Sequence, residues 1–106
     1  MGKKEQQAAA ALTGTEFLIM SLLVQNRGKE MYGLEMVGKS GGKLKKGTIY
    51  VLLGRLEGKG FVTARSETMS GSAIPRRLYR PTGLGQRVFD AWRKVAEIGG
   101  LRGAYA

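Results

Sequence analysis

The chain has 106 residues, a net charge of +10, and neither cysteine nor histidine. This length suits a single domain, and the lack of cysteine excludes disulfide bonds and thiolate chemistry. No apolar run approaches the roughly 18 residues of a membrane-spanning helix, and residues 1–12 lack the apolar core of a signal peptide. We therefore expect a cytoplasmic protein that is not inserted in a membrane.

The positive charge is concentrated in one part of the chain. Residues 43–80 hold nine basic and two acidic side chains, a net charge of +7, whereas residues 13–42 are neutral overall. Evenly spread charge would indicate only solubility, but a concentrated basic block is typical of a surface that binds a polyanion. The alternative is a basic face that is merely solvated.

Residues for catalysis are few. The eight carboxylates are scattered, with neither the spacing of a paired acid and base nor that of metal ligands. The glycine-containing segment from Gly54 to Gly60 follows no predicted strand. It also lacks the length of a phosphate-binding loop. The sequence predicts no enzyme, no cofactor and no metal site.

The first half of the chain predicts three helices after a tail at residues 1–11. The first begins at Thr13, where a hydroxyl and the carboxylate of Glu16 form a capping box. It is apolar almost all round, and Gly28 is the expected left-handed residue after its C-terminus. The second helix is predicted over Met31–Lys39 and ends at the turn Ser40-Gly41-Gly42.

The third predicted helix lies in the segment from Lys43 to Gly60 and starts near Gly47-Thr48. Apolar residues recur with the spacing of an amphipathic helix, at Ile49, Leu52, Leu53 and Leu56. The opposite face carries Thr48, Tyr50 and Arg55. Gly54 and Gly58 lie inside this helix and each costs up to about 1 kcal/mol relative to alanine. We expect packing on the first two helices, more than intrinsic propensity, to hold it.

The second half predicts two strands and a fourth helix. Residues 61–65 and 76–80 have strand character, and the polar, turn-rich residues 67–75 join them as a hairpin. Thr82 is a candidate N-cap for a helix over Leu84–Ile98, and residues 99–106 are expected to be loose. Three helices followed by a hairpin indicate a helix-turn-helix unit with a wing.

Several segments in this order carry a family resemblance. They are Glu16-Phe17-Leu18-Ile19, Tyr32-Gly33-Leu34-Glu35, the run from Gly47 to Gly60 (GTIYVLLGRLEGKG), and the run from Arg77 to Gly85 (RLYRPTGLG). Together they resemble the PadR family of winged-helix transcriptional regulators, over residues 12 to 98. Val51 departs from the pattern, because many members have proline after the tyrosine.

The resemblance implies an α+β, mostly α-helical fold: a winged helix-turn-helix with a three-helix core and a β-hairpin wing at residues 12–81, followed by a C-terminal dimerisation helix at residues 82–98. It also implies a homodimer paired through the first and fourth helices. In such a dimer the third helix enters the major groove of double-stranded DNA and the wing touches the adjacent backbone.

The candidate DNA-binding side chains are the hydroxyl, phenol and basic groups in and around this motif: Tyr32, Lys43, Lys45, Lys46, Thr48, Tyr50, Arg55, Arg76 and Arg77. The three lysines would contact phosphates beside a helix N-terminus. Alternative roles are a solvated turn for the lysines, an N-cap for Thr48, core packing for Tyr32, packing at the wing junction for Tyr50, and an ion pair with Glu57 or Glu35 for Arg55. Because neighbours in a strand point to opposite faces, only one of Arg76 and Arg77 is expected to face DNA.

Trp92, the only tryptophan, lies on the fourth helix. The resemblance implies that a small planar aromatic effector can bind between the C-terminal helices of a dimer, where Trp92 would stack on it. The alternative, which we favour, is an ordinary core or dimer anchor.

The sequence as a whole predicts a nucleoid-associated DNA-binding regulator, a repressor that acts as a homodimer on a pseudo-palindromic operator. Two alternatives stay open. One is a non-specific or architectural nucleic-acid-binding protein. The other is a winged helix used for protein–protein contact.

Overall fold

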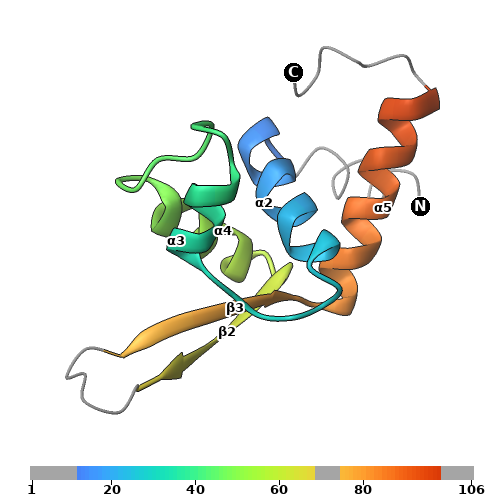
Figure 1. The fold of residues 1–106 in the computed structure, drawn as a ribbon. Helices are drawn as coiled ribbons and strands as arrows, with labels where there is room; N and C mark the ends of the chain where they lie inside the picture. The colour runs from blue at the N-terminus through green and yellow to red at the C-terminus, as the bar shows by residue number, and fades with distance from the viewer. Residues whose placement is uncertain (1–11, 69–74, 99–106) are drawn as a thin grey trace.

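The computed structural model describes residues 12–68 and 75–98 (Figure 1). The predicted tails at residues 1–11 and 99–106, and the centre of the predicted hairpin loop at residues 69–74, lie outside them. The elements are α2 (Gly14–Gln25), β1 (Met31–Tyr32), α3 (Gly33–Lys39), α4 (Ile49–Gly58), β2 (Val62–Glu67), β3 (Arg76–Pro81) and α5 (Gly83–Ile98). This is the α+β, mostly α-helical order that the sequence predicts.

Helix α2 begins with the predicted capping box. The Glu16 backbone N–H donates to the Thr13 hydroxyl at 3.2 Å, and the Thr13 N–H donates to the Glu16 carboxylate at 3.0 Å. Glu16 is only 1% exposed, and its carboxylate also accepts from Lys59 Nζ at 3.0 Å. The carboxylate that starts α2 therefore also fixes the end of α4 against it.

The end of α2 differs from the prediction. The C-cap is Asn26, and the next residue, Arg27, already has a left-handed φ of 59°. Gly28 also has a positive φ, of 74°. It lies two residues after the C-cap, whereas the prediction placed it directly after the C-cap. The turn toward β1 thus needs two left-handed residues in succession, of which only the second is a glycine.

The second predicted helix is shorter than expected, and a strand precedes it. Met31 and Tyr32 form β1 and pair with Tyr79 and Leu78 of β3 in antiparallel register. Met31 is fully buried in the core. Helix α3 starts only at Gly33, where the Glu35 carboxylate accepts the Tyr32 backbone N–H at 2.8 Å.

The predicted hairpin is part of a three-stranded antiparallel sheet of order β1-β3-β2. The pairs from Val62 with Pro81 to Glu67 with Arg76 set the register of its two long strands. The hairpin projects away from the helices as a wing (Figure 1). The prediction of two strands is therefore correct for the wing and incomplete for the sheet.

Helix α4 buries the predicted face. Ile49, Leu53 and Leu56 are fully buried, and Leu52 packs against the same core. The helix ends in a Schellman motif, because the Phe61 N–H donates to the Leu56 carbonyl at 2.9 Å and the Gly60 N–H to the Glu57 carbonyl at 3.0 Å. Gly60 supplies the left-handed φ of 80° that this turn requires.

Thr82 is the N-cap of α5, as predicted, and it also joins α5 to the end of α4. Its hydroxyl accepts from the Gly85 N–H at 2.9 Å and donates to the Gly60 carbonyl at 2.6 Å. Its own N–H donates to the Phe61 carbonyl at 3.0 Å. Gly85 packs so closely here that an added Cβ would lie 2.8 Å from the Phe61 carbonyl carbon.

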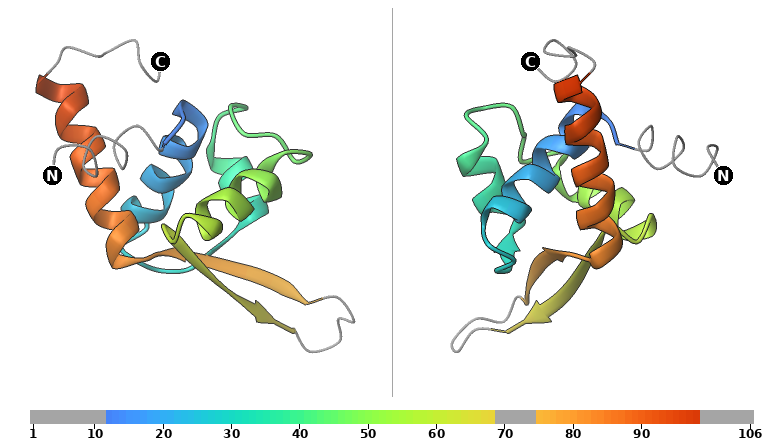
Figure 2. Two further views of the ribbon diagram at one scale, coloured as in Figure 1. Left: turned by 180° about the vertical axis from the view of Figure 1, so that it is seen from behind. Right: turned by 90° about the vertical axis from the view of Figure 1, so that its right-hand side faces the viewer.

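Helix α5 lies beside α2 (Figure 2). Phe17 of α2 stacks on Phe89 of α5 with ring centroids 5.0 Å apart, and it meets Trp92 at 4.7 Å. Leu84 and Val95 stay exposed, at 44% and 49%. Within the described residues, no helix combines the length and apolar character of a membrane span.

Candidate nucleic-acid interface

The loop between α3 and α4 presents lysines on an anchored backbone. Leu44 is 2% exposed, and its N–H donates to the Ser40 hydroxyl at 3.0 Å. Its neighbours Lys43, Lys45 and Lys46 are all exposed. One buried leucine thus holds the loop, while three ammonium groups remain in solvent immediately before α4.

The outer face of α4 matches the predicted set. Tyr50 is 49% exposed, Val51 is 56% exposed, and Arg55 is exposed. Thr48 occupies the N-cap position, but its hydroxyl donates to the Lys45 carbonyl at 3.4 Å and makes no cap hydrogen bond. Neither of the alternative ion pairs of Arg55, with Glu57 or with Glu35, forms in the described part of the chain.

The Tyr50 ring lies directly over Gly33, the first residue of α3. A Cβ at Gly33 would lie 2.8 Å from Tyr50 Cε1 and 3.0 Å from Cζ. Real Cβ atoms are essentially never that close to another heavy atom. The ring position on α4 therefore depends on a glycine in α3.

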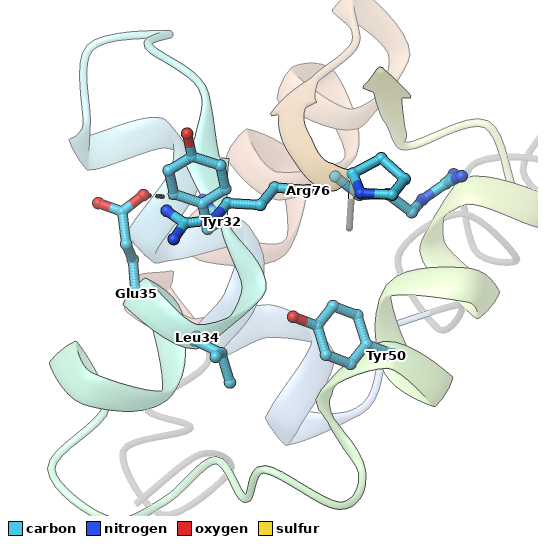
Figure 3. A pocket seen from close by; sticks show the side chains of 7 residues that line it. Tyr32, Leu34, Glu35, Tyr50 and Arg76 are labelled. Atoms are coloured by element: carbon cyan, nitrogen blue, oxygen red, sulfur yellow. Dashed lines mark hydrogen bonds between the residues drawn. The ribbon is translucent and has the colours of Figure 1, made fainter. Parts of the chain in front are cut away.

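A cleft of about 490 Å³ opens between α3, α4 and the start of β3 (Figure 3). Its walls bring together four of the predicted side chains and three others: Tyr32, Leu34, Glu35, Tyr50, Pro75, Arg76 and Arg77. The residues that form it come from three separate parts of the sequence. Aromatic, aliphatic and guanidinium groups meet there.

Arg76 and Arg77 diverge, as the strand periodicity predicts. The Arg76 guanidinium lies over the Tyr32 ring, 5.4 Å from its centroid. Arg77 turns the other way, toward α4, where Nη2 donates to both carboxylate oxygens of Glu57 at 3.2 Å. Arg77 Nε also donates to the Tyr79 hydroxyl at 3.2 Å, and this bond raises the pKa of Arg77.

The outer face of the wing carries a second network. The Tyr32 hydroxyl donates to Glu67 at 2.9 Å, which raises the pKa of the phenol above its ordinary value. Arg65 donates to both oxygens of Glu30, at 2.9 and 2.7 Å, and thereby lowers the pKa of that carboxyl. Arg65 Nη2 also lies 3.5 Å from Glu67 Oε2. These contacts fasten β1 and the segment before it to the wing.

The ion pairs divide the basic block into two groups. Lys59, Arg65 and Arg77 each have a carboxylate partner. Six others have none within the described residues: Lys43, Lys45, Lys46, Arg55, Arg76 and Arg80. Five of these six were predicted DNA-binding residues, and Arg80 was not. The effective positive surface is thus smaller than the count of basic residues suggests.

Comparison with known proteins identifies the family to which this fold belongs. The model of the transcriptional regulator PadR-like family matches residues 19–91, more than half of the chain. The chain belongs to the PadR-like family. It is a transcriptional regulator, and its elements form the winged helix that the family resemblance implied. A comparison with curated proteins gave no significant match.

Solved PadR structures share this fold. A PadR family regulator from Clostridium difficile R20291 is 26% identical, with a TM-score of 0.67, over 81% of this chain and 90% of that one. One from Eggerthella lenta DSM 2243 is 27% identical, with a TM-score of 0.62, over 82% and 80%. PadR of Bacillus subtilis, solved in complex with operator DNA, is 26% identical with a TM-score of 0.63; the match covers 74% of this chain but only 46% of that longer protein.

Trp92 lies away from the cleft, on α5 of this PadR-like chain. It is half-buried and packs against Phe17. This contact agrees with the role of a core anchor, and the effector-binding role stays a prediction. Across residues 12–68 and 75–98, no cluster of candidate ligands has the arrangement of a metal site.

Sequence reasoning missed the residues whose role depends on distant partners. The cleft is also lined by Leu34, Glu35 and Pro75. Glu57 forms an ion pair with Arg77, and Gly33 leaves space for the Tyr50 ring. In the sequence, the tyrosine-glycine pair at residues 32–33 stands out only as part of a family motif. Its spacing from Tyr50 gives no local signal of the contact.

Proposed function

We propose that this PadR-like regulator is a homodimer that binds double-stranded DNA sequence-specifically and represses transcription from a pseudo-palindromic operator. The observation that carries this proposal is that exposed basic and aromatic side chains lie on neighbouring elements. The anchored lysine loop, the exposed face of α4 and the cleft beside the wing adjoin one another. Winged helices place such a helix in the major groove, where side chains reach base edges.

The charge distribution supports DNA as the partner. Lysines that form no ion pair within residues 12–68 and 75–98 lie before the start of α4, where they can contact phosphates on either side of a groove. Arg55 lies on the same helix and carries a guanidinium that suits a guanine edge. The operator complex of the Bacillus subtilis relative adds support. We place the protein in the cytoplasm, associated with the nucleoid.

The surface of α5 supports a dimer. Leu84 and Val95 are about half exposed, Trp92 is partly exposed, and the partly buried residues of α2 include Leu18 and Leu22. We propose residues 82–98 as the dimerisation helix beside the DNA-binding unit of residues 12–81. A small planar aromatic effector would stack on the exposed part of Trp92, and quenching of its fluorescence would report such binding.

The decisive experiment selects binding sites from random duplexes and reads them by sequencing. We expect two half-sites related by a two-fold axis and about one DNA turn, roughly 34 Å, apart. Arg55→Ala should relax the preference at one base pair, whereas Arg93→Ala on α5 serves as the control. Light scattering should report twice the mass of one chain.

Other outcomes would select an alternative function. Recovery of random sequence would indicate a non-specific or architectural binder. Failure to bind any duplex at moderate salt would indicate a protein-contact module. A monomer at micromolar concentration would rule out the two-fold arrangement of the site.

A further inference from the structure

Tyr50 is exposed, and its ring occupies the space above Gly33. Gly33 leaves room for the ring where any side chain would collide with it. The backbone of Gly33 does not itself require glycine, because its φ is not among the positive values of this chain. Alanine would also favour the first turn of α3. The glycine thus costs some helix stability and leaves the space that the Tyr50 ring occupies.

The Tyr50 hydroxyl has no hydrogen-bond partner among the described residues. Figure 3 shows it directed into the cleft, with Tyr32 and Arg76 on another side. The Arg76 guanidinium is oriented by the Tyr32 ring, 5.4 Å away, and has no carboxylate partner in the same described part of the chain. Two donors therefore face one space from different elements. The Tyr50 hydroxyl makes no hydrogen bond within the described residues, whereas the Arg76 guanidinium contacts the Tyr32 side chain.

The remaining walls are mixed: they include apolar groups and the Glu35 carboxylate, one oxygen of which accepts the Tyr32 backbone N–H. Leu34 is 48% exposed and lines the cleft together with Pro75 and the face of the Tyr50 ring. Donors combined with aliphatic and aromatic walls match a sugar joined to a phosphate, because the deoxyribose offers apolar surface and the phosphate accepts hydrogen bonds. A guanidinium is also well suited to phosphate geometry.

We propose that this cleft binds one sugar–phosphate unit of the DNA backbone. The Tyr50 hydroxyl and the Arg76 guanidinium donate to the phosphate, and Leu34 and Pro75 contact the deoxyribose. Gly33 acts as a positioning residue, because it leaves the space in which the Tyr50 ring reaches the cleft. This assignment rests on the proposed function and specifies where the wing side of the recognition surface grips the duplex.

The first test compares Gly33→Ala and Tyr50→Phe on the duplex recovered by site selection. Loss of a hydrogen bond to a charged group should weaken binding roughly tenfold or more in each variant. Gly33→Ala should add little in the Tyr50→Phe background, because both changes remove the same contact. Gly38→Ala, in the same helix with open space around it, is the matched control and should bind like the wild type.

Thermal unfolding separates this role from a structural one. Gly33→Ala should unfold at the wild-type temperature or above it, since alanine favours the helix. A fall in DNA affinity together with a marked fall in stability would overturn the positioning role. Wild-type affinity in Gly33→Ala, with a loss in Tyr50→Phe, would overturn it as well.

The second test replaces backbone phosphates one at a time with neutral methylphosphonates. One position in each half-site should cost the wild type about tenfold and cost Tyr50→Phe or Arg76→Gln much less. If the duplex binds specifically but no position couples to these residues, the cleft assignment is wrong while the proposed function stands. If no sequence is preferred over random duplex, the proposed function fails, and the cleft assignment fails with it.

Discussion

Arg77 on the wing and Glu57 at the end of α4 form an ion pair with Nη2 3.2 Å from both carboxylate oxygens. The two side chains are 48% and 41% exposed. A pair this open to solvent contributes little to folding. It does, however, cancel one positive charge beside the recognition helix. A phosphate that approaches Arg77 must compete with Glu57.

Glu57→Gln should therefore raise affinity for random duplex at low salt and steepen its salt dependence by about one released ion. The free energy of unfolding should change little. Filter binding over a series of salt concentrations measures both affinity and slope. Glu35→Gln is the matched control, because it removes an equal charge from the cleft without an arginine partner. An equal rise in an Arg77→Gln background would show that only net charge matters.

The lysine loop should dominate the salt dependence. Lys45→Ala combined with Lys46→Ala should reduce the slope of log affinity against log salt by up to about two, for all sequences. Fluorescence anisotropy over a salt series checks this. Arg87→Ala with Lys94→Ala removes the same charge from exposed positions on α5. An unchanged slope in the loop variant would argue against the loop as part of the DNA-binding face.

Gly54 should be a site of easy stabilisation. An added Cβ meets nothing within 4 Å, so Gly54→Ala should raise the free energy of unfolding by up to about 1 kcal/mol. Gly60→Ala should do the opposite, since φ there is +80°. Chemical denaturation of both variants gives the comparison. A destabilised Gly54→Ala would mean that α4 is not limited by its own propensity.

Gly85 should tolerate no side chain. An added Cβ would lie 2.8 Å from a Phe61 backbone carbon and 3.0 Å from Met20 Cε. Gly85→Ala should lower the free energy of unfolding by about 2 kcal/mol or more. Gly83→Ala, two residues earlier, meets only the Arg87 side chain at 3.8 Å and should be neutral. Similar melting temperatures for the two variants would contradict the close docking of α5.

Tyr32 should titrate above the ordinary range of tyrosine. Its hydroxyl donates to Glu67, which favours the neutral phenol and raises its pKa. A pKa raised on folding contributes stability that is fully present at neutral pH and is lost only as alkaline pH passes through the folded value. Glu67→Gln should bring the Tyr32 pKa down. Near-ultraviolet absorbance titration measures the shift, and Tyr32→Phe assigns the step that belongs to Tyr32. If Tyr32 titrates at the same pH in the wild type and in Glu67→Gln, the effect of Glu67 on its pKa is refuted.

The helices and the wing could be predicted because their signals are local. Thr13 and Glu16 cap α2 across three residues, and Thr82 caps α5 in the same way. The apolar period of α4 shows within about two turns. Strand β1 could not be predicted, because two residues carry no period. Met31 becomes a strand residue only through its pairing with Tyr79, far along the chain.

In the candidate interface, too, only the features with local sequence signals could be predicted. Exposure of Tyr50, Arg55 and the loop lysines followed from helix periodicity and charge. The pairing of Arg77 with Glu57 and the contact of Tyr50 with Gly33 depend on three-dimensional register. The sequence could therefore indicate which side chains face outward. It could not indicate which of them already have a partner within the protein.

Thr82 hydrogen-bonds to Gly60 and Phe61, the two residues that terminate α4, and it also caps α5. These hydrogen bonds join the turn after α4 directly to the start of α5. In a dimer paired through α5, the crossing angle of the two α5 helices would fix the separation of the two α4 helices. A change of a few degrees at that crossing would alter the spacing of half-sites that the dimer can span.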